Sequence, residues 1–188
     1  MLLIKLDISK AFDSVRWDYL LSLLQHIGFL AKWRDWIAAI LSTSSSQILL
    51  NGIPGQPINH GRGLRQGDPL SPLLFILAID PLQRLLNLAT EAGILSKLGR
   101  KMRLRTSMYA DDAAIFLRPI KEEVTALKHL LQLFGEVTGL RTNIHKSSIV
   151  PIRCENLDLD DIPCDFPAQR TSFPIKYLGL PLAIRRLR

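Results

Sequence analysis

The hydrophobic and polar positions along the chain predict short strands that alternate with amphipathic helices. An apolar run over residues 1–8 predicts a strand that ends in Asp7. From Trp17 to Ile27 the apolar residues recur at helical spacing, which predicts a helix with one apolar face. Asp13 or Ser14 can cap the start of this helix with a side-chain oxygen.

The middle of the chain predicts a second short helix, a hairpin and one long helix. Residues 31–41 form the second predicted helix, whose tryptophan and isoleucine side chains are expected to face inward. Residues 47–51 and 56–60 have the composition of two strands joined by a turn at 52–55. A long apolar helix is predicted from about residue 70 to residue 89, with an Asp-Pro pair at its start.

The second half of the chain predicts further strands and one more helix. Two β-prone runs flank residues 109–112, and a helix follows from about residue 120 to Gly139. Residues 144–152 predict a strand, and residues 173–182 predict a short hairpin. The acidic, proline-containing residues between them predict a loop. This order of elements indicates an α+β fold, in which helices cover one face of a small, mainly antiparallel sheet.

Bulk composition narrows the class of protein. The chain has 188 residues, of which 47% are hydrophobic, enough for the core of one domain. Its net charge of +7 favours an anionic partner, with nucleic acid as the first candidate. No apolar run reaches the roughly 20 residues of a membrane span, so no membrane is expected. The two cysteines, Cys154 and Cys164, lack metal-type spacing and indicate free thiols in a reducing compartment.

The chemistry centres on Tyr109-Ala110-Asp111-Asp112. Two adjacent carboxylates between apolar runs are costly to leave unpaired, but at the tip of a hairpin they can share a cation. Asp7 ends another apolar strand, so neighbouring strands would bring three carboxylates together. Oxygen ligands suit magnesium, and two such ions can clamp an in-line phosphoryl transfer. The alternative is a solvated Asp-Asp turn, because aspartate is common in turns.

Five ordered segments carry a family resemblance. They are Lys5-Leu6-Asp7-Ile8-Ser9-Lys10-Ala11-Phe12-Asp13, Gly63-Leu64-Arg65-Gln66-Gly67-Asp68-Pro69-Leu70-Ser71-Pro72, the Tyr109–Asp112 motif, residues 139–147, and residues 177–182. Together they resemble the reverse transcriptase palm of LINE-type non-LTR retrotransposons, the plant elements in particular. The resemblance covers nearly the whole chain.

This resemblance implies a fold, an activity and a set of partners. It implies a polymerase palm made of residues 1–13 and 68–182, with residues of about 14–67 as a finger-like insertion. It implies RNA-directed DNA polymerase activity on an RNA template and a DNA primer, with deoxynucleoside triphosphates as substrates. The expected cofactor is Mg²⁺, as two ions, with Mn²⁺ possible in its place. A nuclear location is implied by the family alone.

The resemblance also implies roles for residues near the predicted metals. Asp7, Asp111 and Asp112 match the metal-binding aspartates, and the backbone carbonyl of Ile8 matches an additional metal ligand. Lys146 matches a lysine that protonates the leaving pyrophosphate; a solvated lysine at a strand edge is the alternative.

Further residues match positions that contact nucleotide, template or primer. Phe12 matches a bulky residue beneath the sugar of the incoming nucleotide, where a ring leaves no room for a 2′-hydroxyl; a core aromatic residue is the alternative. Gln66 and Gly67 match the loop that contacts nucleotide and template. The remaining matches are Arg62 and Arg65, for template or primer phosphates unless they are merely solvated, and Gly179, for the turn that holds the primer end.

Other functions compete with an active polymerase. The chain starts at the first catalytic strand and ends after the last palm motif, so a truncated, catalytically silent remnant with non-specific nucleic-acid binding is the main alternative. A group II intron maturase-type reverse transcriptase shares the Asp-Asp motif, but residues 65–72 fit the LINE type better. Phe12 argues against an RNA-dependent RNA polymerase.

Overall fold

A five-stranded sheet forms the centre of the computed structural model, which describes residues 1–99, 105–110, 112–154 and 168–183. The strand order is β6-β7-β1-β8-β9, and every neighbouring pair is antiparallel except β8 and β9. The strands are β1 (Leu2–Asp7), β6 (Thr106–Tyr109), β7 (Asp112–Leu117), β8 (Ser148–Pro151) and β9 (Gln169–Arg170). The predicted mixture of helices with a small, mainly antiparallel sheet is confirmed.

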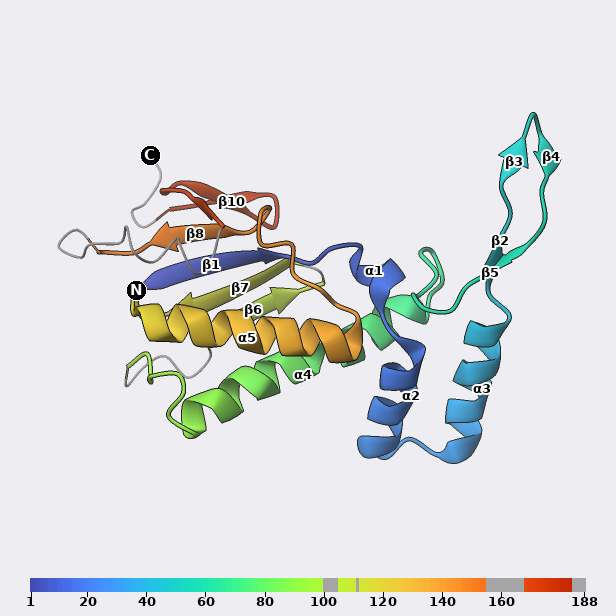
Figure 1. Cartoon of the computed structure of the whole chain (residues 1–188), viewed down its shortest axis with the longest axis horizontal. Coiled ribbons are helices and arrows are strands. Elements are labelled where there is room, and N and C mark those ends of the chain that lie inside the picture. Colours follow the sequence, from blue (N-terminus) through green and yellow to red (C-terminus); the bar gives the residue numbers. More distant parts are fainter. Residues whose placement is uncertain (100–104, 111, 155–167, 184–188) are drawn as a thin grey trace.

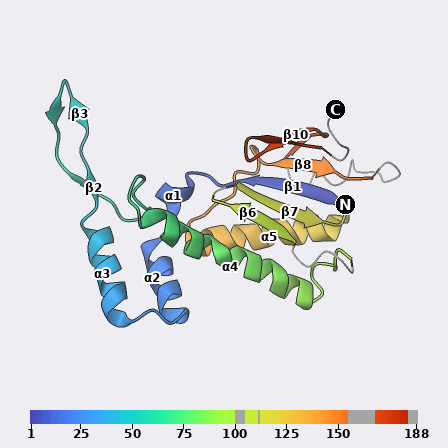
Figure 2. The ribbon, with the colours of Figure 1, turned by 180° about the vertical axis from the view of Figure 1, so that it is seen from behind.

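Two helices cover one face of this sheet, α4 (Ser71–Glu91) and α5 (Lys121–Thr138), as Figure 1 and Figure 2 show. Because strand side chains alternate between faces, every second residue of β1 packs toward these helices. Leu2, Ile4 and Leu6 of β1 are at most 1% exposed and belong to the main core. Full burial of each such side chain contributes about 1.5–3 kcal/mol.

A separate hairpin packs on the other face of the sheet. It consists of β10 (Ile175–Tyr177) and β11 (Leu180–Leu182), as predicted. Its Ile175 and Tyr177 pack near a small cluster formed by Leu3, Ala114 and Val150. The other alternate residues of β1, including Asp7, therefore lie on the face opposite the helices.

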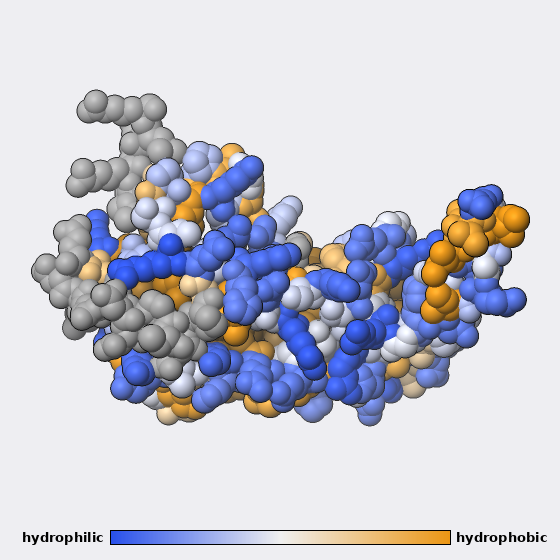
Figure 3. Space-filling model, turned by 45° about the horizontal axis from the view of Figure 1, so that its top comes forward, coloured by the Kyte–Doolittle hydropathy of each residue, from blue (hydrophilic) through white to orange (hydrophobic). Residues whose placement is uncertain are grey.

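The segment between residues 11 and 59 extends away from the sheet (Figure 1). It contains α1 (Ala11–Ser14), α2 (Trp17–His26), α3 (Ala31–Ser42), β2 (Ser45–Ser46), β3 (Leu49–Leu50), β4 (Ile53–Pro54) and β5 (Ile58–Asn59). Strands β2 to β5 form a narrow ribbon in which β2 pairs with β5 and β3 with β4. Apolar side chains at its tip are exposed, as Figure 3 shows.

Several local predictions in this segment are wrong. The helix α2 follows Arg16 and has no side-chain cap; Ser14 instead donates its hydroxyl to the carbonyl of Ser9. Only Ile37 of the predicted inward residues of α3 is buried, whereas Trp36 and Ile40 are more than half exposed. Helix α3 packs mainly on α2, which covers only part of its apolar face.

Three element boundaries also differ from the predictions. The hairpin turn lies between β3 and β4, before the predicted position, at Asn51-Gly52, where both residues have positive φ. The strand predicted over 144–152 begins only at Ser148, because residues 143–147 form a hydrogen-bonded turn. The predicted loop over 155–172 contains β9, and its residues 155–167 lie outside the described part of the chain.

Helix α4 satisfies the length and composition of a membrane span, contrary to the expectation from the sequence. Its apolar face, however, packs into the core through Leu74, Phe75, Leu82 and other residues. An Asp80–Arg84 ion pair (2.9 Å) lies in its middle. These features are those of a core helix in a globular domain.

Candidate active site

Two of the predicted carboxylates lie on neighbouring strands at the same height. Asp7 ends β1, Asp112 begins β7, and the two residues are direct partners in the antiparallel register. Leu6 and Ala113, their neighbours, point toward the helices, so both carboxylates lie on the opposite face. Directly opposed residues have Cβ atoms about 4.5–5.5 Å apart. Two carboxylates of this spacing can bind one cation between them.

A cavity of about 380 Å³ opens beside these carboxylates. Lys146 lines it together with Asp7 and Asp112, and so do Lys5 and Lys176. Lys5 Nζ lies 3.6 Å from Asp112 Oδ1 and donates a hydrogen bond to the carbonyl of Lys176 at 3.3 Å. The cavity thus places ammonium groups next to carboxylates. This arrangement suits an anion with bound cations, because the ammonium groups can contact the anion and the carboxylates the cations.

The backbone of Asp7 is held by a segment far away in the sequence. Its carbonyl accepts a hydrogen bond from the amide of Asn143 (2.7 Å), and its amide donates to Ser147 Oγ (3.2 Å). Ser147 is 1% exposed and donates its own hydroxyl to the carbonyl of Asn143 at 2.8 Å. The adjacent Ile8 forms a single bridge with Thr142. Sequence reasoning missed this supporting role of Asn143 and Ser147, although both lie in one of the five family segments.

The third predicted carboxylate, Asp111, lies outside the described residues. Tyr109 and Asp112 on either side are register partners, and Ala110 has a φ of +51°, as residues of tight hairpin turns do. Tyr109 is 68% exposed. Within the ranges that the structure describes, no group of three or more metal-binding side chains occurs.

A second site lies where the glycine-rich loop meets the segment after β1. The amides of Gly63 and Leu64 donate to the carbonyls of Val15 (2.8 Å) and Phe12 (2.7 Å). Trp17 Nε1 donates to the carbonyl of Gly63 at 2.7 Å. The loop is therefore fixed to the chain immediately downstream of the Asp7 strand.

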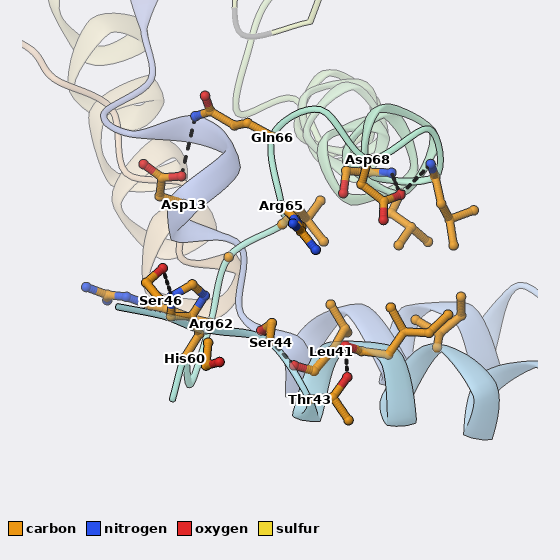
Figure 4. A pocket seen from close by; sticks show the side chains of 18 of the residues that line it. Asp13, Leu41, Thr43, Ser44, Ser46, His60, Arg62, Arg65, Gln66 and Asp68 are labelled. Atoms are coloured by element: carbon orange, nitrogen blue, oxygen red, sulfur yellow. Dashed lines mark hydrogen bonds between the residues drawn. The ribbon is translucent and has the colours of Figure 1, made fainter. Parts of the chain in front are cut away.

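This loop borders a cavity of about 950 Å³, which extends to the end of α3 and the base of the ribbon (Figure 4). Arg62, Arg65 and Gln66 line it and are exposed. The two carboxylates that also line it are engaged: Asp13 Oδ1 accepts from Gln66 Nε2 (3.4 Å), and Asp68 Oδ1 accepts from backbone amides at the start of α4. The two guanidinium groups are therefore the positive charges available to a bound anion.

The remaining predicted contact residues lie at separate positions. Phe12 is half-buried and stacks on Phe75 of α4, with ring centroids 4.6 Å apart. Gly67 has a φ of +86° and open space around it among the described residues. Gly179 lies in the turn between β10 and β11, also with a positive φ. The structure thus brings Asp7, Asp112 and Lys146 to one cavity, and Arg62, Arg65 and Gln66 to another.

Comparison with known proteins identifies the family of the chain. The family described as reverse transcriptase (RNA-dependent DNA polymerase) matches residues 1–182. The chain belongs to the reverse transcriptase family. Its similarity to proteins of retrotransposable elements supports the LINE type within that family.

Individual relatives cover most of the chain. It is 31% identical over 184 residues, 96% of its length, to the transposon TX1 uncharacterized 149 kDa protein of Xenopus laevis. It is 28% identical over 93% of its length to the Pol polyprotein of the retrotransposable element R2DM of Drosophila melanogaster. An uncharacterized mitochondrial protein of Arabidopsis thaliana is 41% identical over 69 residues, 35% of this chain and 57% of that protein. The chain spans only 14% and 17% of the first two relatives.

Proposed function

We propose that the chain carries the catalytic centre of an RNA-directed DNA polymerase. It would extend a DNA primer on an RNA template, with deoxynucleoside triphosphates as substrates. The observation that carries this proposal is the register pairing of Asp7 with Asp112 beside the lysine-lined cavity. Two carboxylates and several ammonium groups at one point are what a triphosphate and its bound cations require.

The described residues fit a divalent cation. None of them donates a hydrogen bond to the carboxylate of Asp7, which faces the same side as Asp112. In the proposal Asp7, Asp111, Asp112 and the carbonyl of Ile8 would hold two Mg²⁺ ions, which Mn²⁺ can replace. When bound, the ions would supply charge neutralisation and activation of the primer 3′-hydroxyl. Asn143 and Ser147 hold the backbone of Asp7 for this role.

Other residues of the chain would bind and orient the substrates. Lys146, at the edge of the carboxylate cavity, would donate a proton to the departing pyrophosphate. The Phe12 ring, fixed by stacking on Phe75, would limit space at the sugar and so favour deoxynucleotides. Gln66 and Gly67 would contact the nucleotide, and positively charged Arg62 and Arg65 would bind phosphates. The turn at Gly179 would hold the primer end.

The division into subdomains is part of the same proposal. Residues 1–13 and 68–182 contribute the sheet and its covering helices, which we assign to a palm. Residues of about 14–67 extend from one end of this layer (Figure 1), which supports a finger-like insertion.

Primer extension on an RNA template tests the function. It would be measured with the chain alone and with the chain joined to the flanking polypeptide of a full-length relative. Asp7→Asn should lower magnesium-dependent incorporation by about 100-fold or more, because it removes a charged ligand. Asp35→Asn, which removes the same charge from the exposed face of α3, is the matched control and should leave the rate unchanged.

The main alternative predicts a different outcome of this assay. A silent remnant would bind RNA and DNA with an affinity that falls steeply with salt, yet incorporate no nucleotide in either form. Equal rates for Asp7→Asn and the wild type would refute the metal role of Asp7.

A further inference from the structure

Asp13 occupies a junction that the proposed function leaves without a role. It follows Phe12 directly, and its backbone lies against Gly63, where an added Cβ would be 2.8 Å from the Asp13 carbonyl oxygen. The hydrogen bonds of Gly63 and Leu64 to Val15 and Phe12 fix the loop on this segment. The side chains of Asp13 and Gln66 therefore start from backbones that are fixed relative to each other.

The hydrogen bond between Asp13 and Gln66 determines which end of the Gln66 amide faces Asp13. Gln66 Nε2 donates to Asp13 Oδ1 at 3.4 Å, and Figure 4 shows the amide oxygen of Gln66 turned away from Asp13. A carboxylate can only accept hydrogen bonds, whereas a glutamine amide carries donors on one side and an acceptor on the other. Asp13 is thus complementary to one of the two orientations of the Gln66 amide and repels the other.

We propose that Asp13 is a positioning residue that fixes the Gln66 amide with its oxygen outward, as an acceptor for a hydrogen-bond donor on the incoming nucleotide. The inference rests on the proposed function, in which Gln66 contacts that nucleotide. A held amide loses less rotamer freedom when the nucleotide binds than a free one, so the contact improves nucleotide affinity.

A purely electrostatic role for Asp13 predicts the opposite change in nucleotide binding, so an experiment can distinguish the two roles. The Asp13 carboxylate lines the same cavity as Arg62 and Arg65 and would repel a triphosphate. If Asp13 acted only through its charge, Asp13→Asn would improve nucleotide binding. If Asp13 positions Gln66, the same substitution weakens binding, because an asparagine amide can pair with either face of Gln66.

The first experiment observes the contact without activity. The side-chain NH₂ signals of Gln66 in the ¹⁵N-labelled chain are identified by their loss in Gln66→Ala, and compared between wild type, Asp13→Asn and the control Asp35→Asn. The proposal expects the signals to move in Asp13→Asn alone. Unchanged signals in Asp13→Asn would overturn it.

The second experiment is a double-mutant cycle in the primer-extension assay. Asp13→Asn should raise the KM for deoxynucleotides about two- to tenfold, the range of one hydrogen bond, with kcat nearly unchanged. In the Gln66→Ala background it should have no further effect, since a residue that acts only through another shows full coupling. A lowered KM in Asp13→Asn would overturn the proposal. So would a double variant in which the effects of Asp13→Asn and Gln66→Ala on KM multiply.

The two experiments separate this inference from the proposed function. A wild type that incorporates no nucleotide refutes the polymerase proposal, while the NMR comparison still decides whether Asp13 holds the amide. If Gln66→Ala leaves the KM unchanged, the nucleotide contact of Gln66 is wrong and the role of Asp13 in binding fails with it.

Discussion

The contact at Gly63 yields the most quantitative prediction, for Gly63→Ala. Gly63 has a φ of +91°, which costs an alanine about 1 kcal/mol or more. The new Cβ would also lie 2.8 Å from the Asp13 carbonyl oxygen and 3.0 Å from two more backbone atoms of that residue. Relief requires a shift of about half an ångström, which stretches the three hydrogen bonds that hold the loop, each worth about 1 kcal/mol. We expect a total loss of about 2–4 kcal/mol.

Gly28→Ala is the matched control for this prediction. Gly28 has nearly the same φ (+92°), and no atom of another described residue beyond its chain neighbours lies within 4 Å of where a Cβ would be, so its substitution carries the backbone cost alone. Urea unfolding followed by far-UV circular dichroism measures both free energies of unfolding. Equal losses for the two variants would refute the reasoning that close approach, rather than φ, makes Gly63 necessary.

Two further predictions concern groups buried away from the site. Glu123→Gln should destabilise the chain by about 3–5 kcal/mol in urea unfolding. It removes the negative charge 3.8 Å from the buried guanidinium of Arg105, whose hydrogen bonds go to the neutral carbonyls of Ser96 and Phe116. The exposed Glu122→Gln should change the free energy of unfolding by less than about 0.5 kcal/mol. Burial raises the pKa of Tyr19 to about 12, so the folded state holds this proton more tightly than the unfolded state and stability falls as pH rises from about 10 to 12. Tyr19→Phe, which loses the hydrogen bond to the Ala78 carbonyl (3.0 Å), should be less stable at pH 7 but show a smaller alkaline loss than the wild type.

The sequence was sufficient for features that depend on local periodicity. Helical spacing of apolar residues located α4 and α5 to within a few residues, and Gly139 ends α5 with a left-handed φ as expected. The positions of Asp7, Asp111 and Asp112 at the ends of apolar strands predicted that their carboxylates converge if those strands are neighbours in one sheet; Asp111 lies outside the described residues. The structure shows that β1 and β7 are neighbours and adds the register, in which Asp7 pairs directly with Asp112.

Features that depend on contacts between distant parts of the chain could not be predicted from the sequence. The inward face assigned to α3 assumed neighbours on all of its apolar side, but Trp36 and Ile40 have none among the described residues that bury them. Asp7 is supported by a backbone hydrogen bond from Asn143, which any residue could form, and by the hydroxyl of Ser147, which lies 140 residues away in the sequence. No local pattern of side chains indicates either contact. The same holds for the loop at Gly63, where a glycine in the sequence indicates flexibility as readily as close packing.

These contacts fix the parts of the candidate site relative to one another. Asp7 is fixed on one side by its ladder with β7 and on the other by residues 143–147, because β8 starts only at Ser148 and cannot pair with it. A few residues further, the chain is joined to the loop at Gly63. The Asp7 and Asp112 carboxylates, the turn at residues 143–147 and the loop at Gly63 are all held by one short segment, residues 7–17. Phosphoryl transfer depends mainly on positioning, so a shift of this segment would misplace both cavities at once, even where every functional side chain is retained.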